Sequence, residues 1–431
     1  MPRLVDKVIS SKLESMGAVL IEGPKWCGKT RSAREASNSA LYIRGSTSAG
    51  RIKGLIDLES TVFLEGDPPM LIDEWQNVPE IWDVVRFEVD ERGEPGQFIL
   101  TGSAVPPADA TMHSGVGRFA VVRMRTMSLF ESGESNGSVS LSGLFGGEGV
   151  NARSNLTLEA LVHAGVRGGW PGVIGGDSSS ARPAEDYLRI LVSEDMSRFL
   201  YRSIVNGSGE PSEGPQAYNQ RVHDIAFRTV QSISRNLATA ASAKSICRDV
   251  NARENLVSEP TLAKYLGALD RLFVTENLEA WNPHVRSRTR LRKARKWHFT
   301  DPSLAAAALG AGEADLLRDY NALGFFFESM CLRDLRAYLD PVGGRVSYLA
   351  NNNGYEVDFI LELPDGRWAG VEAKLGDSEF DRAAENLLKL GEFVDTGRLG
   401  EPAFLAILTA MPYGYTRPDG VHVVPLGCLR D

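Results

Sequence analysis

The segment Gly23–Thr30, GPKWCGKT, constrains the fold more than any other feature of the 431-residue sequence. It matches the spacing G-x-x-x-x-G-K-[ST] in full and follows the apolar run AVLI at 18–21. In this pattern the glycines let backbone N–H groups curl around phosphates, and the lysine reaches the β- and γ-phosphate oxygens. A glycine turn between a strand and a helix is the alternative. The apolar run before the segment and the helical pattern after it favour a phosphate-binding loop.

A second apolar run, PMLIDEW at 69–75, ends in two acidic residues and strengthens this interpretation. We expect Asp73 to hold Mg²⁺ through water, with the Thr30 hydroxyl on the other side of the ion, and Glu74 to polarise the attacking water. A charged strand end is the simpler explanation of these acids taken alone, but a hydrolytic site needs both parts. The sequence therefore predicts ATP and Mg²⁺ as cofactors, with nucleotide contacts at Gly23, Pro24, Lys25, Trp26, Cys27, Gly28, Lys29, Thr30 and Arg31.

Two further features are candidates for catalysis alongside Lys29 and Glu74. The strand FILTGS ends in Thr101-Gly102-Ser103. In additional-strand P-loop ATPases the strand between the two phosphate-site strands carries a polar sensor, a role open to Thr101 or Ser103. Helix N-capping explains such hydroxyls equally well. Arg118 precedes the fifth strand and is either an arginine finger or a surface arginine.

Composition excludes several classes of protein. No apolar run approaches the ~18 residues that cross a bilayer, and the start, MPRLVDKVIS, lacks a signal-peptide pattern. The four cysteines lie far apart and form no CxxC, which favours reduced thiols. A net charge of −9 argues against a chain that coats nucleic acid everywhere, but leaves room for a local basic patch. We expect a cytoplasmic protein without a membrane partner.

The order of segments predicts an α/β protein of several domains. Short apolar runs at 17–23, 40–45, 69–75, 97–103 and 120–129 alternate with helical stretches, which indicates a parallel sheet. Residues 131–155 are rich in Gly and Ser and are expected to form a loop or domain edge outside any core. The expected domains are a P-loop ATPase core (1–130), a connection with a helical lid (131–220), a winged-helix-like domain (221–310) and a mixed α/β domain (311–431).

A basic segment follows a helix-turn-helix pattern in the third domain. The helices at 245–250 and 260–272 and the strand VTENLEAW precede RSRTRLRKARK at 286–296, which has seven cations and no acid. Such a strand is placed like a wing and suggests contact with the phosphate backbone of DNA or RNA. A solvated strand, or a bridge to an acidic surface, has equal weight. The candidate nucleic-acid contacts are Arg286, Arg288, Arg290, Arg292, Lys293, Arg295 and Lys296.

Carboxylates gather in the last domain. Asp358 lies in one expected strand, Glu372 and Lys374 share a face of the next, and Glu328 lies in the apolar helix GFFFESM. Glu328, Asp358 and Glu372 could hold divalent ions through oxygen, with Lys374 orienting or activating water beside a phosphate. An acid in a helix, an Asp in a strand and E-x-K in the next strand is the arrangement of the restriction-endonuclease-like fold.

As an ordered set, these motifs resemble prokaryotic AAA-type ATPases that carry a C-terminal restriction-nuclease-like domain. The set comprises GPKWCGKT, LIDEWQNVPEIWDVV, FILTGS, the GR pair, RGGWPGV, GFFFES, EVDFIL and VEAK. The resemblance implies an Asp-Glu-x-Gln motif that places Gln76 at the site as a nucleotide or interface contact. It also implies a nucleotide-dependent switch or motor, and we expect that copies of the chain can form a homo-oligomer.

Three functions remain open from the sequence. The first is an ATP hydrolase that couples nucleotide binding and hydrolysis to nucleic-acid handling through residues 286–296. The second is an ATP-dependent regulatory or signalling switch that acts on a protein partner, with the C-terminal domain as a scaffold. The third is an ATP-gated, Mg²⁺-dependent nuclease.

Overall fold

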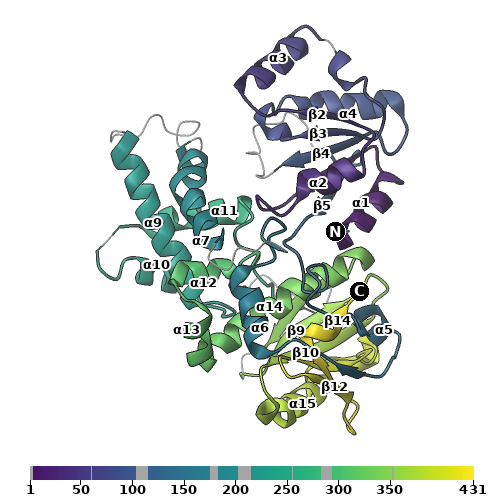
Figure 1. Ribbon diagram of the computed structural model, residues 1–431, viewed down its shortest axis with the longest axis vertical. Coiled ribbons are helices and arrows are strands. Elements are labelled where there is room, and N and C mark those ends of the chain that lie inside the picture. The colour runs from purple at the N-terminus through teal and green to yellow at the C-terminus, as the bar shows by residue number, and fades with distance from the viewer. Residues whose placement is uncertain are drawn as a thin grey trace. The chain divides into compact units, whose positions relative to one another are not determined.

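The computed structural model describes residues 3–59, 61–102, 115–174, 183–201, 215–254, 256–282, 294–351 and 354–431 (Figure 1). The chain divides into two compact units. The first contains Met1–Thr126 and Arg271–Phe273, and the second contains Met127–Asp270 and Val274–Asp431.

The first unit is built on a five-stranded parallel sheet with the order β2-β3-β4-β1-β5. The expected parallel sheet is confirmed, and β4 lies between the loop strand β1 and the acidic strand β3, as in additional-strand ATPases. Its strands are β1 (Ala18–Glu22), β2 (Ser39–Tyr42), β3 (Met70–Asp73), β4 (Phe98–Gly102) and β5 (Phe119–Arg123). Its helices are α1 (Leu4–Leu13), α2 (Lys29–Glu35), α3 (Ser46–Asp57) and α4 (Ile81–Arg92).

Both faces of this sheet are covered because its strands alternate apolar residues to the two sides. On one face Val19, Ile21 and Ile99 pack in a core with residues of α1 and α2. On the other face Ile72 and Leu100 pack in a core with residues of α3 and α4. The sheet is therefore the middle layer of three. The carboxyl ends of β1, β3 and β4 lie together and bring their terminal residues to one edge.

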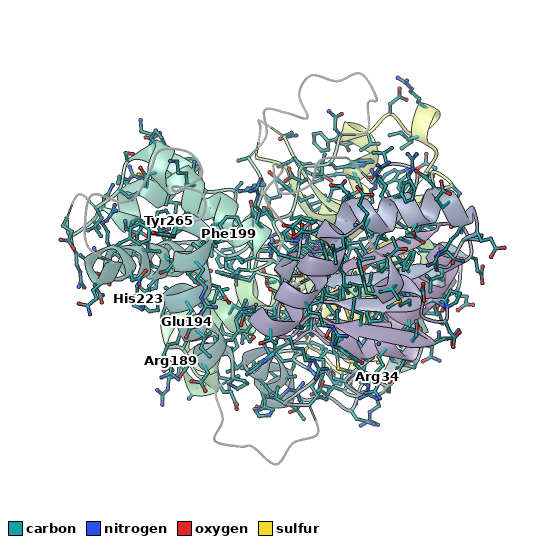
Figure 2. The ribbon with its side chains drawn as sticks, turned by 90° about the horizontal axis from the view of Figure 1, so that it is seen from above. Arg34, Arg189, Glu194, Phe199, His223 and Tyr265 are labelled. Carbon is teal, nitrogen blue, oxygen red and sulfur yellow. The ribbon has the colours of Figure 1, made fainter. Side chains whose placement is uncertain are left out.

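The second unit contains a helical part in which α9 packs against α10 and α12. Figure 2 labels Arg189 on α7, His223 on α9 and Tyr265 on α11. Polar caps fix several helix starts: the Thr157 side chain accepts from Ala160 N at α6, and Ser242 accepts from Ser245 N at α10. The helices are α6 (Leu158–Arg167), α7 (Pro183–Ile190), α9 (Pro215–Arg235), α10 (Ala243–Val250), α11 (Glu259–Arg271), α12 (Ser303–Leu309) and α13 (Glu313–Arg318).

The same unit contains a seven-stranded mixed sheet with the order β7-β12-β13-β11-β10-β9-β8. Helix α14 (Tyr320–Leu339) contacts β8 and β10, while α15 (Phe380–Leu388) contacts β10 and β11. Strands β8, β9 and β10 pair antiparallel, and β10, β11 and β13 pair parallel. The strands are β7 (Asn151–Arg153), β8 (Arg345–Ala350), β9 (Glu356–Glu362), β10 (Trp368–Lys374), β11 (Leu405–Thr409), β12 (Tyr413–Thr416) and β13 (His422–Pro425).

The remaining elements of this unit are short. Strands β6 (Val139–Ser140) and β14 (Leu429–Arg430) pair in parallel. Helix α5 (Leu141–Phe145) follows β6, and α16 (Leu390–Phe393) and α17 (Thr396–Leu399) follow α15. Among the described residues, no helix has the length and apolar character that crossing a membrane requires.

The structure corrects two expectations. Residues 131–155 were expected to form a loop or domain edge outside any core. The expectation of a loop outside the core was wrong. The segment contains β6, α5 and β7, β7 joins the seven-stranded sheet, and Leu141, Leu144 and Phe145 are buried. The fifth strand was expected to reach residue 129 but ends at Arg123. Beyond Arg123, the N–H of Met127 donates to Gly169 O and the N–H of Leu129 donates to the Asp334 carboxylate. These N–H groups therefore bond to residues outside the five-stranded sheet.

Candidate functional site

The phosphate-loop sequence forms a tight turn between β1 and α2. Gly23, Trp26 and Gly28 have positive φ values of 151°, 68° and 102°. At Gly23 a Cβ atom would lie 2.1 Å from the carbonyl oxygen of Met124, so only glycine fits there. Cys27 is buried and packs in the core beneath the loop, whereas the Trp26 side chain is 58% exposed. The loop conformation thus depends on both of its motif glycines.

Lys29 is the buried cation of the loop. Its ammonium group donates to the carbonyl oxygens of Gly23 and Pro24, at 2.9 and 2.7 Å. These bonds hold the ammonium group against the backbone at the start of the loop. Lys25 and Arg31 are exposed, and Arg31 pairs with Glu35 at 2.9 Å.

Asp73 joins three elements at the edge of the sheet. Its Oδ1 accepts hydrogen bonds from Thr30 Oγ1 at 2.8 Å and from Thr101 Oγ1 at 2.6 Å. The strand register explains this meeting, because Thr101 of β4 is paired with Asp73 on one side and with Ile21 on the other. The site therefore has a buried carboxylate within reach of the loop hydroxyl, the donor set that Mg²⁺ prefers.

Glu74 lies directly after the strand, in a left-handed conformation with φ 59°. Its carboxylate accepts a hydrogen bond from the Gln76 side-chain amide at 2.5 Å. Gln76 therefore contacts the acid that is expected to polarise water, and fixes the direction in which that carboxylate points. The sequence placed Gln76 at this site but gave it a nucleotide or interface contact rather than this one.

Arg118 and the two sensor candidates complete the predicted site residues of the first unit. Arg118 forms a two-point pair with Asp90 of α4, at 2.9 and 3.1 Å, and its side chain is partly exposed. Ser103 lies outside the described residues. Thr101 is the one of the two sensor candidates that the structure describes, and its hydroxyl is directed to Asp73.

A second polar site lies in the other unit, on β9 and β10. Asp358 and Glu372 lie on these neighbouring antiparallel strands, and the ammonium group of Lys374 donates to both, at 3.1 and 2.7 Å. The N–H of Ala373 also donates to Asp358, at 3.0 Å. The structure thus brings together three residues that the sequence predicted to share a site.

Lys296 is a member of this site that the sequence analysis did not foresee. Its side chain is 3% exposed, and its ammonium group lies 2.9 Å from Glu328 Oε1, 2.5 Å from Glu356 Oε1 and 3.9 Å from Asp358 Oδ1. The expected contact of Lys296 with nucleic acid was therefore wrong, because its charge is buried among carboxylates. We refer to Lys296, Glu328, Asp358, Glu372 and Lys374 as the carboxylate–lysine cluster.

Burial is the largest influence on the pKa of each carboxyl in the cluster. It raises the pKa of Glu328 and that of Glu372 to about 8, an effect that the charge of Asp358 increases and the lysines oppose. Burial also acts to raise the pKa of Asp358, but Lys374 and Lys296 outweigh it and lower that pKa below its ordinary value. At pH 7 Asp358 is therefore the charged carboxylate between two ammonium groups, while Glu328 and Glu372 retain protons.

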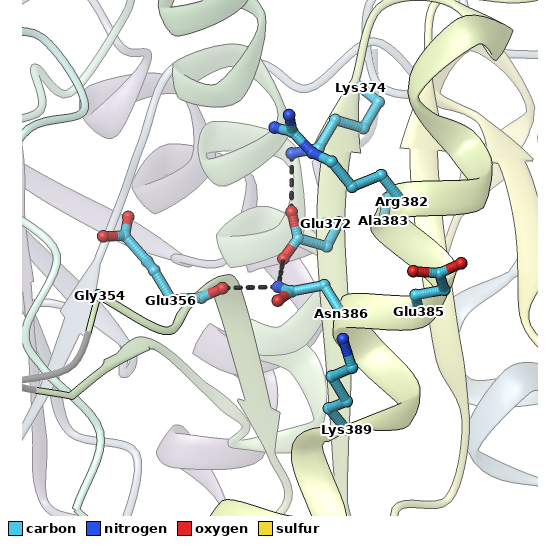
Figure 3. A pocket seen from close by; sticks show the side chains of 9 residues that line it. All are labelled: Gly354, Glu356, Glu372, Lys374, Arg382, Ala383, Glu385, Asn386 and Lys389. Atoms are coloured by element: carbon cyan, nitrogen blue, oxygen red, sulfur yellow. Dashed lines mark hydrogen bonds and ion pairs between the residues drawn. The ribbon is translucent and has the colours of Figure 1, made fainter.

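A pocket of about 310 Å³ opens beside Glu372 and Lys374 (Figure 3). Asn386 of α15 lies between the strands: its amide donates to Glu372 Oε1 at 2.8 Å and to the backbone oxygen of Glu356 at 2.7 Å. Arg382 and Lys389 of the same helical segment line the pocket as well. Asn386 was not predicted from the sequence, although the helical spacing of Ala383, Asn386 and Leu387 on the packed face of α15 could have suggested it.

Most of the basic segment lies outside the described residues. Arg286, Arg288, Arg290, Arg292 and Lys293 lie outside the described residues. Arg295 is described, and it pairs with Asp270 of α11 at 3.0 Å. Among the residues that the structure covers, no group of three or more His, Cys, Asp or Glu side chains is arranged to hold a metal ion.

Three family models match parts of the chain. Residues 15–132 match the model described as an AAA domain. Residues 215–315 match a domain of unknown function, DUF8612, and residues 323–429 match another, DUF4143. The AAA match coincides with the parallel sheet and the phosphate loop, and together they support a P-loop ATPase domain in the first unit.

Two mycobacterial proteins resemble most of the chain. "Uncharacterized protein Rv2008c" of Mycobacterium tuberculosis and "Uncharacterized protein Mb2031c" of Mycobacterium bovis are each 25% identical over 369 residues. The aligned part covers 83% of this chain and 70% of each relative. Among solved structures, the Walker-type ATPase PABY2304 of Pyrococcus abyssi is 13% identical with a TM-score of 0.39, over 70% of this chain and 94% of that one.

Proposed function

We propose that the protein is a Mg²⁺-dependent ATP hydrolase whose nucleotide cycle is coupled to nucleic-acid handling. The observation that carries the hydrolase is the Asp73 carboxylate, which accepts from both Thr30 and Thr101 beside the loop lysine. A buried carboxylate at this point suits a metal ion, since the loop hydroxyl and the strand acid lie 2.8 Å apart and could bind one ion side by side.

The residues present fit the nucleotide and its ion. Backbone N–H groups of the loop after Pro24 would bind the phosphates, and Lys29 would exchange its two carbonyl partners for phosphate oxygens. Thr30 and Asp73 would hold Mg²⁺, which when bound neutralises charge on the β- and γ-phosphates. Glu74, held by Gln76, would accept the proton of the attacking water.

The coupling to nucleic acid rests on the region between α10 and residue 299. Helices α10 and α11 have helix-turn-helix order, and the segments after them meet in antiparallel bridges, Thr275 with Phe299 and Leu278 with Lys296. Two such segments after a helix pair support a winged-helix-like arrangement. The cations at 286–295 lie in the chain between these bridged segments, where a wing would present them to phosphates.

The proposal for residues 311–431 is a restriction-endonuclease-like fold. Its support is the order of α14, three antiparallel strands, α15 and the parallel strands β11 and β13, with Asp358 and Glu372 side by side. We propose no reaction at this site.

The test is the rate of ATP hydrolysis by the full chain across a panel of single- and double-stranded DNA and RNA, with the mass of the protein in ATP measured in parallel. Lys29→Ala and Glu74→Gln are expected to abolish turnover. Nucleic acid is expected to raise turnover, and substitution of Arg286, Arg288, Arg290 and Arg292 by Gln is expected to cancel that rise without lowering the basal rate. If no nucleic acid changes the rate of ATP hydrolysis, the proposed coupling to nucleic acid is wrong, while the proposed ATP hydrolase is not contradicted. Coupling to a protein partner would then be the function to test.

A further inference from the structure

The carboxylate–lysine cluster holds a cation supplied by its own chain. The ammonium group of Lys296 lies 2.9 Å from Glu328 and 3.9 Å from Asp358, two of the three acids that the sequence predicted to bind metal. Its side chain is 3% exposed, so bulk water does not compete for these contacts. A charge buried to this degree requires partners of the opposite sign, and the ion pairs with Asp358 and with Glu356, at 3.9 and 2.5 Å, provide them.

The oxygens that a metal ion would need are already engaged. Asp358 Oδ2 accepts from Lys374 and from the N–H of Ala373, and its Oδ1 faces Lys296. Glu372 Oε2 accepts from Lys374 and its Oε1 accepts from Asn386. Mg²⁺ requires nearly octahedral oxygen coordination at about 2.0–2.1 Å, which these partners would have to release.

Lys296 is held in place from both of its ends. Its backbone N–H donates to Leu278 O at 2.9 Å and its carbonyl accepts from Leu278 N at 3.0 Å. Trp297, the next residue, is buried and donates from its indole to Ala241 O at 2.7 Å. At the other end of the side chain, the ammonium lies 5.3 Å from the centre of the Tyr348 ring. The lysine is therefore a fixed part of the cluster.

We propose that Lys296 is the resident cation of the carboxylate–lysine cluster, and that the cluster takes no divalent metal ion while Lys296 is present. A metal ion at Glu328 and Asp358 would lie within a few ångströms of a buried ammonium group, and the two positive charges would repel each other strongly. The donor set therefore does not fit a divalent ion. At the phosphate loop, by contrast, the side chains that donate to Asp73 Oδ1 are the neutral hydroxyls of Thr30 and Thr101. The inference is independent of the proposed ATP hydrolysis, which takes place in the other unit.

The experiment is a titration of the full chain with Mn²⁺, in which bound and free ion are distinguished by electron paramagnetic resonance. Asp73→Asn is present throughout to weaken binding at the phosphate loop. With Lys296 intact, we expect no Mn²⁺ at the cluster. Lys296→Met, which removes the charge but keeps the bulk, is expected to create one new site, with at least about tenfold tighter binding than Lys296→Arg, which keeps the charge.

Two controls locate the site. Adding Asp358→Asn to Lys296→Met is expected to abolish the new site. Lys389→Met is the matched control, because Lys389 lines the neighbouring pocket with the same charge but is exposed. It should create no site.

The inference is overturned if the protein with Lys296 intact binds Mn²⁺ and loses that ion on Asp358→Asn or Glu372→Gln. It is also overturned if Lys296→Met folds, as judged by near-UV circular dichroism, yet gains no site. If Lys296→Met does not fold, the titrations with Lys296 intact decide the question by themselves, since they measure whether Asp358 and Glu372 hold an ion in the native cluster.

Discussion

At the scale of single residues, Asp73 links the parts of the phosphate-loop site. One of its oxygens accepts from the loop and from β4, so the position of a carboxylate that could hold Mg²⁺ depends on hydroxyls from two other elements. Thr101 is 1% exposed and has Asp73 as its partner, which gives its hydroxyl a positioning role.

Replacing Thr101 with Val should therefore impair hydrolysis without unfolding the sheet. The change keeps the shape of the side chain and removes a hydrogen bond to a charged group, worth about 1.5–3 kcal/mol. We expect kcat to fall by roughly tenfold to a hundredfold and the Mg²⁺ concentration for half-maximal activity to rise. Thr101→Ser, which keeps the hydroxyl, should restore most of both. Steady-state turnover at varied Mg²⁺ measures the effect, and wild-type Mg²⁺ dependence in Thr101→Val would contradict it.

Glu328 provides a residue-scale prediction about pH. Burial raises its pKa to about 8 from an ordinary value of 4.5, so between these values the folded protein binds a proton that the unfolded chain releases. The stabilisation is complete below 4.5 and is lost as the pH rises through about 8. Ionisation of this carboxyl should lower the free energy of unfolding by about 1–2 kcal/mol between pH 7 and pH 9. Glu372 acts in the same direction, because its pKa is raised alike.

Glu328→Gln separates this effect from the rest of the chain, because the amide cannot ionise. Its free energy of unfolding should decline less steeply between pH 7 and 9 than that of the wild type, by about 1 kcal/mol. The pKa of Asp358 is lowered and those of both lysines are raised, so these groups change little in this window. Urea unfolding at pH 7, 8 and 9 measures the difference. Parallel declines in the two proteins would show that Glu328 does not hold the proton.

At the scale of elements, residues 131–155 show how a sequence poor in apolar residues can still enter a core. Phe145 of α5 is 5% exposed and meets Phe404 with ring centres 5.0 Å apart. Strand β7 completes the edge of the seven-stranded sheet by pairing with β12. The segment is thus part of the same fold as the C-terminal strands, although about 260 residues separate β7 from β12.

Phe145→Ala should therefore destabilise the second unit strongly. Truncating a buried phenylalanine costs about 3–5 kcal/mol, the sum of lost burial and a cavity. Glu148→Ala, in the same segment at an exposed position, should change stability by no more than about 0.5 kcal/mol. Thermal unfolding followed by circular dichroism compares them. Equal effects of the two changes would place Phe145 outside the core.

The elements that the sequence predicted well are those with a strong local pattern. The parallel strands of the first unit, helix α14 and strands β8 to β11 all carry apolar runs of the expected period. The phosphate-loop site was predictable because each of its parts carries a local motif of its own, although Asp73 lies 43 positions beyond Thr30. The elements that it missed depend on distant partners. Strand β12 reads YGYT and β7 reads NAR, neither of which is apolar. Strand β12 is stabilised by pairing with β13 and β7, and β7 by pairing with β12.

Lys296 is a second case in which distant partners, not the local sequence, determine where a residue lies. Its neighbours in sequence are basic, so the local pattern predicts an exposed strand. Its partners, Glu328 and Asp358, lie 32 and 62 positions further along and are revealed by the fold alone. The sequence WHF at 297–299, which follows Lys296 directly, is buried. Its two aromatic residues were the local indication that the chain becomes buried at the end of the basic segment.

At the scale of the whole molecule, the two polar sites differ in the source of their cation. The first unit offers a carboxylate and a hydroxyl to an ion from solution, whereas the second supplies two ammonium groups of its own. A single ligand, MgATP, should therefore act on one unit directly. Because the chain divides into two compact units, calorimetry can compare how the unfolding of each unit responds to MgATP.

Calorimetry of the full chain should resolve two unfolding transitions, of which only the one belonging to the first unit responds to nucleotide. A ligand at a hundred times its Kd adds about 2.7 kcal/mol to the unit that binds it, which should raise that transition by several degrees. Using a slowly hydrolysed ATP analogue with Mg²⁺ avoids turnover during the scan. Lys29→Ala should abolish the shift, and Phe145→Ala should lower the other transition while leaving the shift intact. One transition that moves as a whole with nucleotide, and falls as a whole in Phe145→Ala, would show that the two units unfold as a single cooperative structure.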